Sequence, residues 1–249
     1  MKKLIKIVER RNLKERTEPL KVFEDRMKDS MALEGAILAK KLSEKLINEA
    51  KNQMIVVMVS CYEAYLRDIF KIIIDEELVP LDRLFKIKQL KDLRFTLKEV
   101  EFIRKKGIKI SEIVCNYINF QNFDQMKQAF SIIDIDKEFS RKIKSKSNIM
   151  PPPKMEIKKS FSKKEIEEKI SEWANEFLKQ FAKNKKTFNL KQLYSSLNFL
   201  LQLRHLIVHE NIKFKIDQDD ILHFTSAIYE FVIILDDIVQ ELKKKSVES

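Results

Sequence analysis

The histidines of this chain, together with one arginine beside them, are the residues whose types and spacing best suit chemistry. The chain has 3 His in 249 residues, and they lie with Arg204 in one short stretch, as His205, His209 and His223. Imidazole titrates near neutral pH and therefore moves protons, whereas a guanidinium holds a phosphate through a planar fork of donors. Proton transfer next to a held phosphate is the chemistry of RNA cleavage.

The helix that must position these groups is expected over about Leu190–Val208. Arg204 falls on its apolar stripe, so the guanidinium needs partners, and we expect Glu63, an isolated acid in the most apolar segment, to orient it. His205 and His209, four residues apart, share a helical face. Arg204 and His209, five residues apart, are separated by about 140° on an ideal helix. Either Arg204 reaches along the surface or the helix ends near His209, and helical periodicity is lost in the connector that follows, which leaves His209 accessible.

Two other interpretations of the histidines stay open. A His-x-x-x-His pair can bind zinc, but the metalloprotease motif has Glu directly after its first His, where this chain has Leu206. A further ligand would have to come from His223 or from the acids Asp217, Asp219 and Asp220. In the other interpretation, Arg204, His205 and His209 only cap and pack the helix C-terminus, where the helix macrodipole favours positive charge. We expect no metal and no other cofactor.

The composition predicts an all-α protein. With 2 Gly and 5 Pro, the chain has few residues for the tight turns of a β protein, while 44% hydrophobic and 35% charged residues suit amphipathic helices. The apolar runs are too short to span a membrane. Cys61 and Cys115 lack metal-ligand spacing and are expected to be reduced and buried. We therefore expect a soluble, cytoplasmic protein.

Helical spacing, capping signals and breakers predict the individual helices. A capping box at Ser162 and Glu165 begins one of them. The expected helices span about Leu20–Asn48, Gln53–Glu77, 81–90, 96–106, 110–118, 122–131, Lys163–Lys183, Leu190–Val208 and Gln218–Lys244.

Positive charge makes an acidic partner such as nucleic acid plausible. The net charge is +11, and the stretch from Arg141 to Lys164 holds nine basic residues and one acid, Glu156. Three consecutive prolines interrupt this stretch, so a solvated linker and a segment that binds a nucleic-acid backbone are both open interpretations. The candidate RNA-binding residues are Arg141, Lys142, Lys144, Lys146, Lys158 and Lys159.

Two segments resemble the HEPN superfamily. The segment Leu200–Asn211 is similar to its Arg-x4-His motif at the end of the penultimate core helix, and Val59–Asp68 is similar to its acid-bearing helix, particularly in the RiboL-PSP type. The resemblance covers about 30–77 and 189–245. It implies a HEPN-type helical bundle with a helical insertion between core helices.

The resemblance also implies a division of the chain. Residues 1–29 would form an N-terminal arm or helix, and 30–249 a single HEPN-like domain. The insertion would occupy about 80–160 and include the basic, proline-containing linker at 141–164.

For activity, the resemblance implies a homodimeric, metal-independent endoribonuclease with a composite site. His209 would act as general base or acid, Arg204 would stabilise the phosphate, and His205 would position the phosphate or share proton transfer. The products would be a 2′,3′-cyclic phosphate and a 5′-hydroxyl. Such proteins serve in defence or toxin–antitoxin systems, so an antitoxin or defence-system partner is expected.

One position departs from a related subgroup. Toxins of this superfamily that a partner nucleotidyltransferase controls often carry Tyr two residues after the motif His, where this chain has Asn211. That type of partner is therefore not expected. The alternative function is a non-catalytic helical dimerisation or binding module for a partner protein or nucleic acid.

Overall fold

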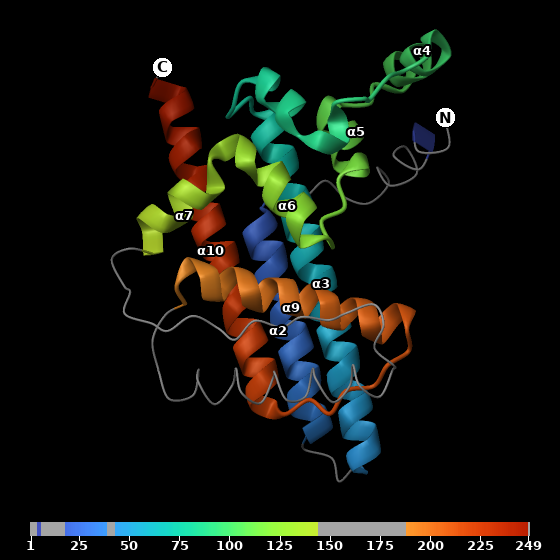
Figure 1. Cartoon of the computed structure of the whole chain (residues 1–249), viewed down its shortest axis with the longest axis vertical. Helices are drawn as coiled ribbons and strands as arrows, with labels where there is room; N and C mark the ends of the chain where they lie inside the picture. The colour runs from blue at the N-terminus through green and yellow to red at the C-terminus, as the bar shows by residue number, and fades with distance from the viewer. Residues whose placement is uncertain (1–3, 6–17, 39–42, 144–187, 249) are drawn as a thin grey trace. The chain divides into compact units, whose positions relative to one another are not determined.

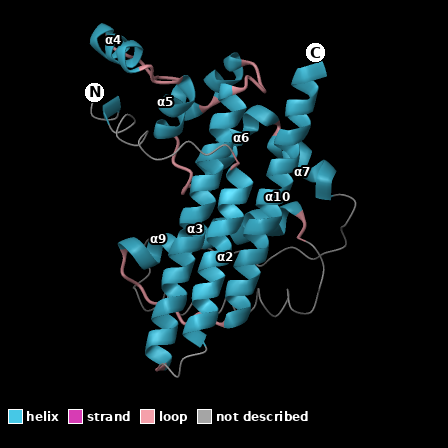
Figure 2. Ribbon diagram, turned by 180° about the vertical axis from the view of Figure 1, so that it is seen from behind, coloured by secondary structure: helices cyan, strands magenta, loops and turns pink. Residues whose placement is uncertain are grey.

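A computed structural model describes residues 4–5, 18–38, 43–143 and 188–248 of the chain. All regular structure among these residues is helical, in agreement with the expected all-α class (Figures 1 and 2). The helix expected over Lys163–Lys183 lies outside the described residues.

The first two long helices divide at a different place from the expected one. Helix α2 spans Pro19–Leu38 and helix α3 spans Glu44–Asp75, so the prediction of one helix over Leu20–Asn48 is wrong. Helix α3 follows Ser43, whose carbonyl accepts a hydrogen bond from the Ile47 N–H at 3.1 Å. Serine is a preferred residue before a helix start, and no Gly or Pro interrupts α3 where the second helix was expected to begin.

Later helices agree with the predictions to within four residues at each end. They are α4 (Leu97–Lys106), α5 (Ile110–Tyr117), α6 (Phe123–Phe130), α9 (Leu190–His209) and α10 (Gln218–Glu248). The segment expected as a helix over 81–90 instead forms two 3₁₀ turns, η1 (Leu81–Lys86) and η2 (Lys88–Leu90). A third 3₁₀ turn, η3, spans Ser131–Ile133.

Helix α7 (Ile135–Ile143) was not expected, and it shortens the predicted basic linker. Ile135, Phe139 and Ile143 are buried along one face at a spacing of four residues, which is helical spacing. Residues 141–143 are therefore helical, and a linker that begins at residue 141 is wrong for these three positions.

The chain forms two compact units, each assembled from separate stretches. Unit 1 comprises 1–23, 63–138 and 233–249, and unit 2 comprises 24–62 and 139–232. The expected division between residues 29 and 30 falls within helix α2. Within the described part of the chain, no helix has both the length and the apolar character needed to cross a membrane.

Aromatic side chains form the centre of unit 1. The ring of Phe70 on α3 packs against Phe120 and Phe130, with centroid distances of 5.8 and 5.3 Å, and all three are fully buried. Edge-on packing of this kind adds to the energy of apolar burial. These contacts hold the short helices that follow α3 against it.

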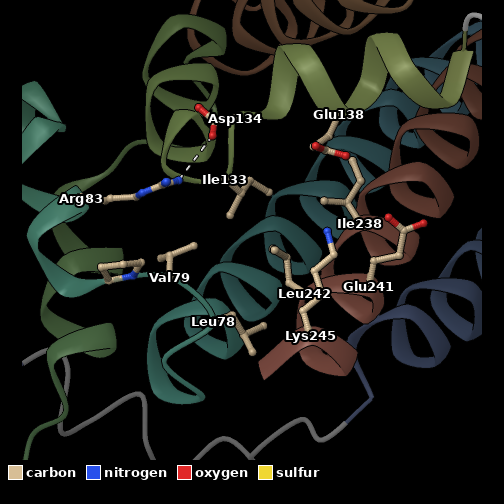
Figure 3. Close-up of a pocket in the computed structure, with 11 residues that line it drawn as sticks. Leu78, Val79, Arg83, Ile133, Asp134, Glu138, Ile238, Glu241, Leu242 and Lys245 are labelled. Carbon is tan, nitrogen blue, oxygen red and sulfur yellow. Dashed lines mark hydrogen bonds and ion pairs between the residues drawn. The ribbon is translucent and has the colours of Figure 1, made fainter. Parts of the chain in front are cut away.

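Unit 1 also contains a pocket of about 240 Å³ (Figure 3). Its walls combine aliphatic side chains with charged ones. Arg83 at its edge donates to the carbonyl of Ile132 at 2.8 Å and pairs with Asp134 at 3.4 Å. The guanidinium is therefore engaged by the protein itself.

A second aromatic cluster lies in unit 2. Phe231 on α10 packs against Tyr62 of α3 at 5.6 Å and against Phe139 of α7 at 4.8 Å between ring centroids. Burial raises the pKa of the Tyr62 hydroxyl well above its ordinary value. This cluster and the buried face of α9 form the support on which the candidate site is built.

Candidate active site

Helix α9 positions the candidate residues and is well defined at its start. The Asn189 side chain accepts from the Gln192 N–H at 2.9 Å, and Gln192 accepts from the Asn189 N–H at 3.1 Å. This reciprocal capping box satisfies two donors of the first turn. The leucines buried along this helix are Leu193, Leu197, Leu200, Leu201 and Leu203.

The helix ends at His209, as the sequence predicted. The N–H groups of Glu210 and Ile212 both donate to the carbonyl of Leu206, at 3.1 and 3.2 Å. Asn211 adopts the left-handed region with φ of 51°, which asparagine tolerates better than most residues. Asn211 therefore turns the chain away from the helix immediately after the motif.

The three predicted catalytic residues lie together at this end of α9. Nη1 of Arg204 is 3.5 Å from Nε2 of His209, and the rings of His205 and His209 are 4.7 Å apart between centroids. Both histidines are exposed, whereas Arg204 is half-buried. The guanidinium thus reaches along the surface to the last residue of the helix.

The connector after the motif is fastened to helix α3 by residues that the sequence analysis did not single out. Asn52 is 1% exposed. Its Nδ2 donates to the Phe214 carbonyl at 2.8 Å and its Oδ1 accepts from the Phe214 N–H at 3.1 Å. Two residues further on, the Ile216 N–H donates to Asn48 at 3.2 Å, and Lys51 donates to the Ile216 carbonyl at 2.9 Å.

The signal for this arrangement was present as a change of period. Ile212, Phe214 and Ile216 are buried, while Lys213 and Lys215 between them are exposed. Alternation with a period of two indicates an extended segment with one buried face. What the alternation could not identify is the asparagine pair, because Asn48 and Asn52 are far from the connector in sequence.

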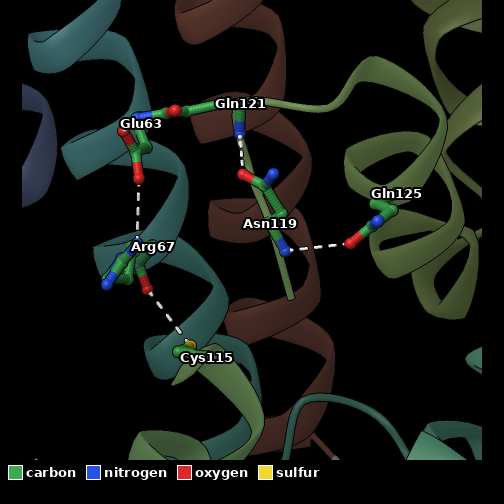
Figure 4. Close-up of polar contacts among 6 residues, drawn as sticks. All are labelled: Glu63, Arg67, Cys115, Asn119, Gln121 and Gln125. Atoms are coloured by element: carbon green, nitrogen blue, oxygen red, sulfur yellow. Dashed lines mark hydrogen bonds and ion pairs between the residues drawn. The ribbon is translucent and has the colours of Figure 1, made fainter. Parts of the chain in front are cut away.

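Glu63 belongs to unit 1, in a polar cluster of its own (Figure 4). Its carboxylate accepts from Arg67 at 2.9 Å and from the side-chain amide of Gln121. The backbone N–H of Gln121 donates to Asn119 at 3.0 Å, so the carboxylate is tied to the connector before α6. Its pairing with Arg204 stays a prediction.

His223 is separate in character from the two exposed histidines. It is 2% exposed, its Nε2 lies 3.2 Å from the Ser196 hydroxyl, and its ring packs against Phe188. Burial lowers the pKa of His223 to about 3. Among the described residues, no group of three or more His, Cys, Asp or Glu is placed to hold a metal ion, so the zinc interpretation finds no third ligand there.

The candidate RNA-binding residues are only partly described. Arg141 and Lys142 lie in the last turn of α7, in the same unit as the motif. Lys144, Lys146, Lys158 and Lys159 lie outside the described residues.

Comparison of the chain with protein-family models, with curated proteins and with solved structures gave no match.

Proposed function

We propose that this protein is a metal-independent endoribonuclease with Arg204, His205 and His209 at its active site. The observation that carries the proposal is the contact of 3.5 Å between Arg204 and His209, with the His205 ring beside it. A guanidinium next to two accessible imidazoles combines a phosphate holder with proton carriers. The HEPN-type bundle is part of the same proposal.

In the proposed reaction, an imidazole removes the proton from the 2′-hydroxyl of RNA. The 2′-oxygen attacks the adjacent phosphorus, the bond from phosphorus to the 5′-oxygen breaks, and that oxygen receives a proton. The products are a 2′,3′-cyclic phosphate and a 5′-hydroxyl. Arg204 stabilises the negative charge that develops on the phosphate oxygens.

Geometry supports a site made by two copies of the chain. In-line attack places the entering and leaving oxygens on opposite sides of phosphorus, so the base and the acid must also lie on opposite sides. His205 and His209 lie side by side on one face of α9, with 4.7 Å between their ring centroids. A second copy facing the first supplies a proton donor on the other side, so we propose a homodimer.

The cellular role is proposed on the resemblance of the motif to HEPN proteins. It would be that of a defence or toxin–antitoxin component acting on RNA in the cytoplasm. A partner that restrains the nuclease follows from such a role.

The test is cleavage of an unstructured RNA in EDTA by the wild-type protein and by His209→Ala. We expect EDTA-resistant cleavage with cyclic-phosphate ends, reduced about 100-fold or more in His209→Ala. Gln202→Ala, an exposed position on the same helix, is the matched control and is expected to cleave normally. Unchanged cleavage by a folded His209→Ala protein would overturn the proposal.

The homodimer has its own test. If the site is composite, a mixture of Arg204→Ala and His209→Ala subunits forms dimers that retain one intact Arg and one intact His at the interface. Activity in the mixture well above that of either variant alone supports the composite site. A wild-type protein that cleaves RNA, and that light scattering shows to be a monomer, contradicts the composite site.

A further inference from the structure

The stretch 83–109 in unit 1 carries a concentration of positive charge. It contains ten Lys or Arg residues against three acids, a net +7 from one part of a chain whose total is +11. One of those acids is engaged locally: the Glu99 carboxylate accepts from the N–H of Thr96 at 3.1 Å. Nine of the ten basic residues are exposed, so the stretch presents positive charge to solvent.

The part of this stretch formed by η1 and η2 has one buried edge and one exposed strip. Leu84, Ile87 and Leu90 are buried at every third position, which is the period of a 3₁₀ helix. Phe85, Lys86 and Lys88 between them are exposed, as is Lys91 directly after Leu90, while Gln89 is half-buried; we refer to Phe85, Lys86, Lys88 and Lys91 as the Phe85 strip. Its backbone is fixed by the three buried aliphatic side chains.

The composition of the Phe85 strip is unusual for a solvated surface. Phe85 is 71% exposed, although transfer of an aromatic ring from water to an apolar environment is favourable. Lys86, Lys88 and Lys91 form no ion pair with any described residue, whereas nearby Arg83 is held by Asp134. An open aromatic face among uncompensated cations is the combination that binds single-stranded nucleic acid, with a base on the ring and phosphates on the lysines.

We propose that the Phe85 strip binds single-stranded RNA. The choice of RNA rests on the proposed function, while the preference for an unpaired strand follows from Phe85. A base can stack on an exposed ring only where it is not already stacked and paired in a duplex. The strip would then hold the substrate at a place distinct in sequence from the Arg204 motif.

Binding, rather than cleavage, is the measurement that tests the strip. A labelled, unstructured RNA of about 12 nucleotides, within the usual range for single-strand sites, is titrated with full-length His209→Ala protein by fluorescence anisotropy. Phe85→Ala in that background is expected to weaken binding about tenfold or more, and Phe85→Trp to restore it. Lys98→Gln and Leu97→Ala, exposed positions on neighbouring α4, are the charge and apolar controls.

Salt dependence tests the lysines separately. Replacing Lys86, Lys88 and Lys91 by Gln is expected to reduce the slope of log K against log salt by about 2, since each single-strand phosphate contact contributes about 0.7. Unchanged affinity in Phe85→Ala would overturn the proposal. It would also be overturned if a hairpin duplex bound as tightly as the single strand, or if phosphatidylserine vesicles bound at the strip and RNA did not.

The two proposals fail in different ways. RNA that binds through Phe85 but is not cut by the wild-type protein rejects the nuclease and retains the strip. RNA that is cut by the wild-type protein, and is bound equally by Phe85→Ala and its parent, rejects the strip and retains the nuclease.

Discussion

Nη1 of Arg204 lies 3.5 Å from Nε2 of His209, although the two residues are five positions apart on one helix. On an ideal helix their side chains diverge by about 140°. They meet because α9 ends at His209 and because the half-buried stem of Arg204 runs along the surface toward that end. A guanidinium can only donate hydrogen bonds, so its suitable ligands are acceptors such as phosphate oxygens.

Two substitutions of Arg204 are expected to distinguish the contribution of its charge from that of its planar guanidinium. Arg204→Ala should lower kcat/KM for RNA about 100-fold or more, since it removes stabilisation of the charged transition state. Arg204→Lys should recover only part of the loss, because an ammonium lacks the planar fork. Single-turnover cleavage with both variants measures the difference. Equal rates for Arg204→Lys and wild type would show that charge alone suffices.

The two hydrogen bonds between Asn52 and Phe214 are expected to stabilise the folded protein. Asn52→Ala leaves the N–H and C=O groups of Phe214 without these buried partners, which should cost about 2–4 kcal/mol of unfolding free energy. Urea unfolding measures it, with exposed Gln53→Ala as the neighbouring control. The variant should also cleave more slowly, because the connector that follows His209 loses its anchor to α3. A loss of less than about 0.5 kcal/mol, the range of neutral surface changes, would contradict this role.

His223 should make the protein sensitive to acid. Its pKa is lowered to about 3 by burial, so the unfolded chain binds the proton first as the pH falls below about 6.5. The stabilisation is therefore fully present above pH 6.5 and is lost as the pH falls toward 3, by about 1.4 kcal/mol per unit. His223→Gln, which can still bond Ser196 but does not titrate, should have a flatter stability profile between pH 7 and 5. Parallel profiles for the two proteins would contradict the assignment.

Asp220 should act in the opposite direction. Burial raises its pKa to about 6, against a smaller lowering by the hydrogen bond from the Asp217 N–H. The folded protein therefore holds this proton between pH 4 and 6 while the unfolded chain has lost it, so stability falls as the pH rises through that window. Asp220→Asn should be more stable than wild type at pH 7.5, with the advantage shrinking toward pH 4. Thermal unfolding at the two pH values checks it, and a constant difference would refute the titration.

Several features of this fold were readable from local signals. The shortage of Gly and Pro indicated helices, and the loss of helical periodicity after His209 placed the end of α9 within one residue. The capping box of Thr96 and Glu99 begins helix α4 and Gly107 ends it, so its bounds lie close to the expected ones. In each case a few adjacent residues carry the free-energy preference, so no knowledge of distant contacts is needed.

The sequence alone determined the helical class, the exposed end of α9 and the presence of Arg204, His205 and His209 on it, because period, capping and helix termination are local properties. The tertiary structure decided which polar residues are hydrogen-bond partners across the fold. Asn52 bonds to Phe214, which is 162 positions away in sequence. The Glu63 carboxylate accepts from Arg67 and Gln121, and His223 is buried beside Ser196. A buried hydrogen bond between distant residues depends on how helices pack, and that packing is set by the sum of many apolar contacts rather than by the spacing of any motif.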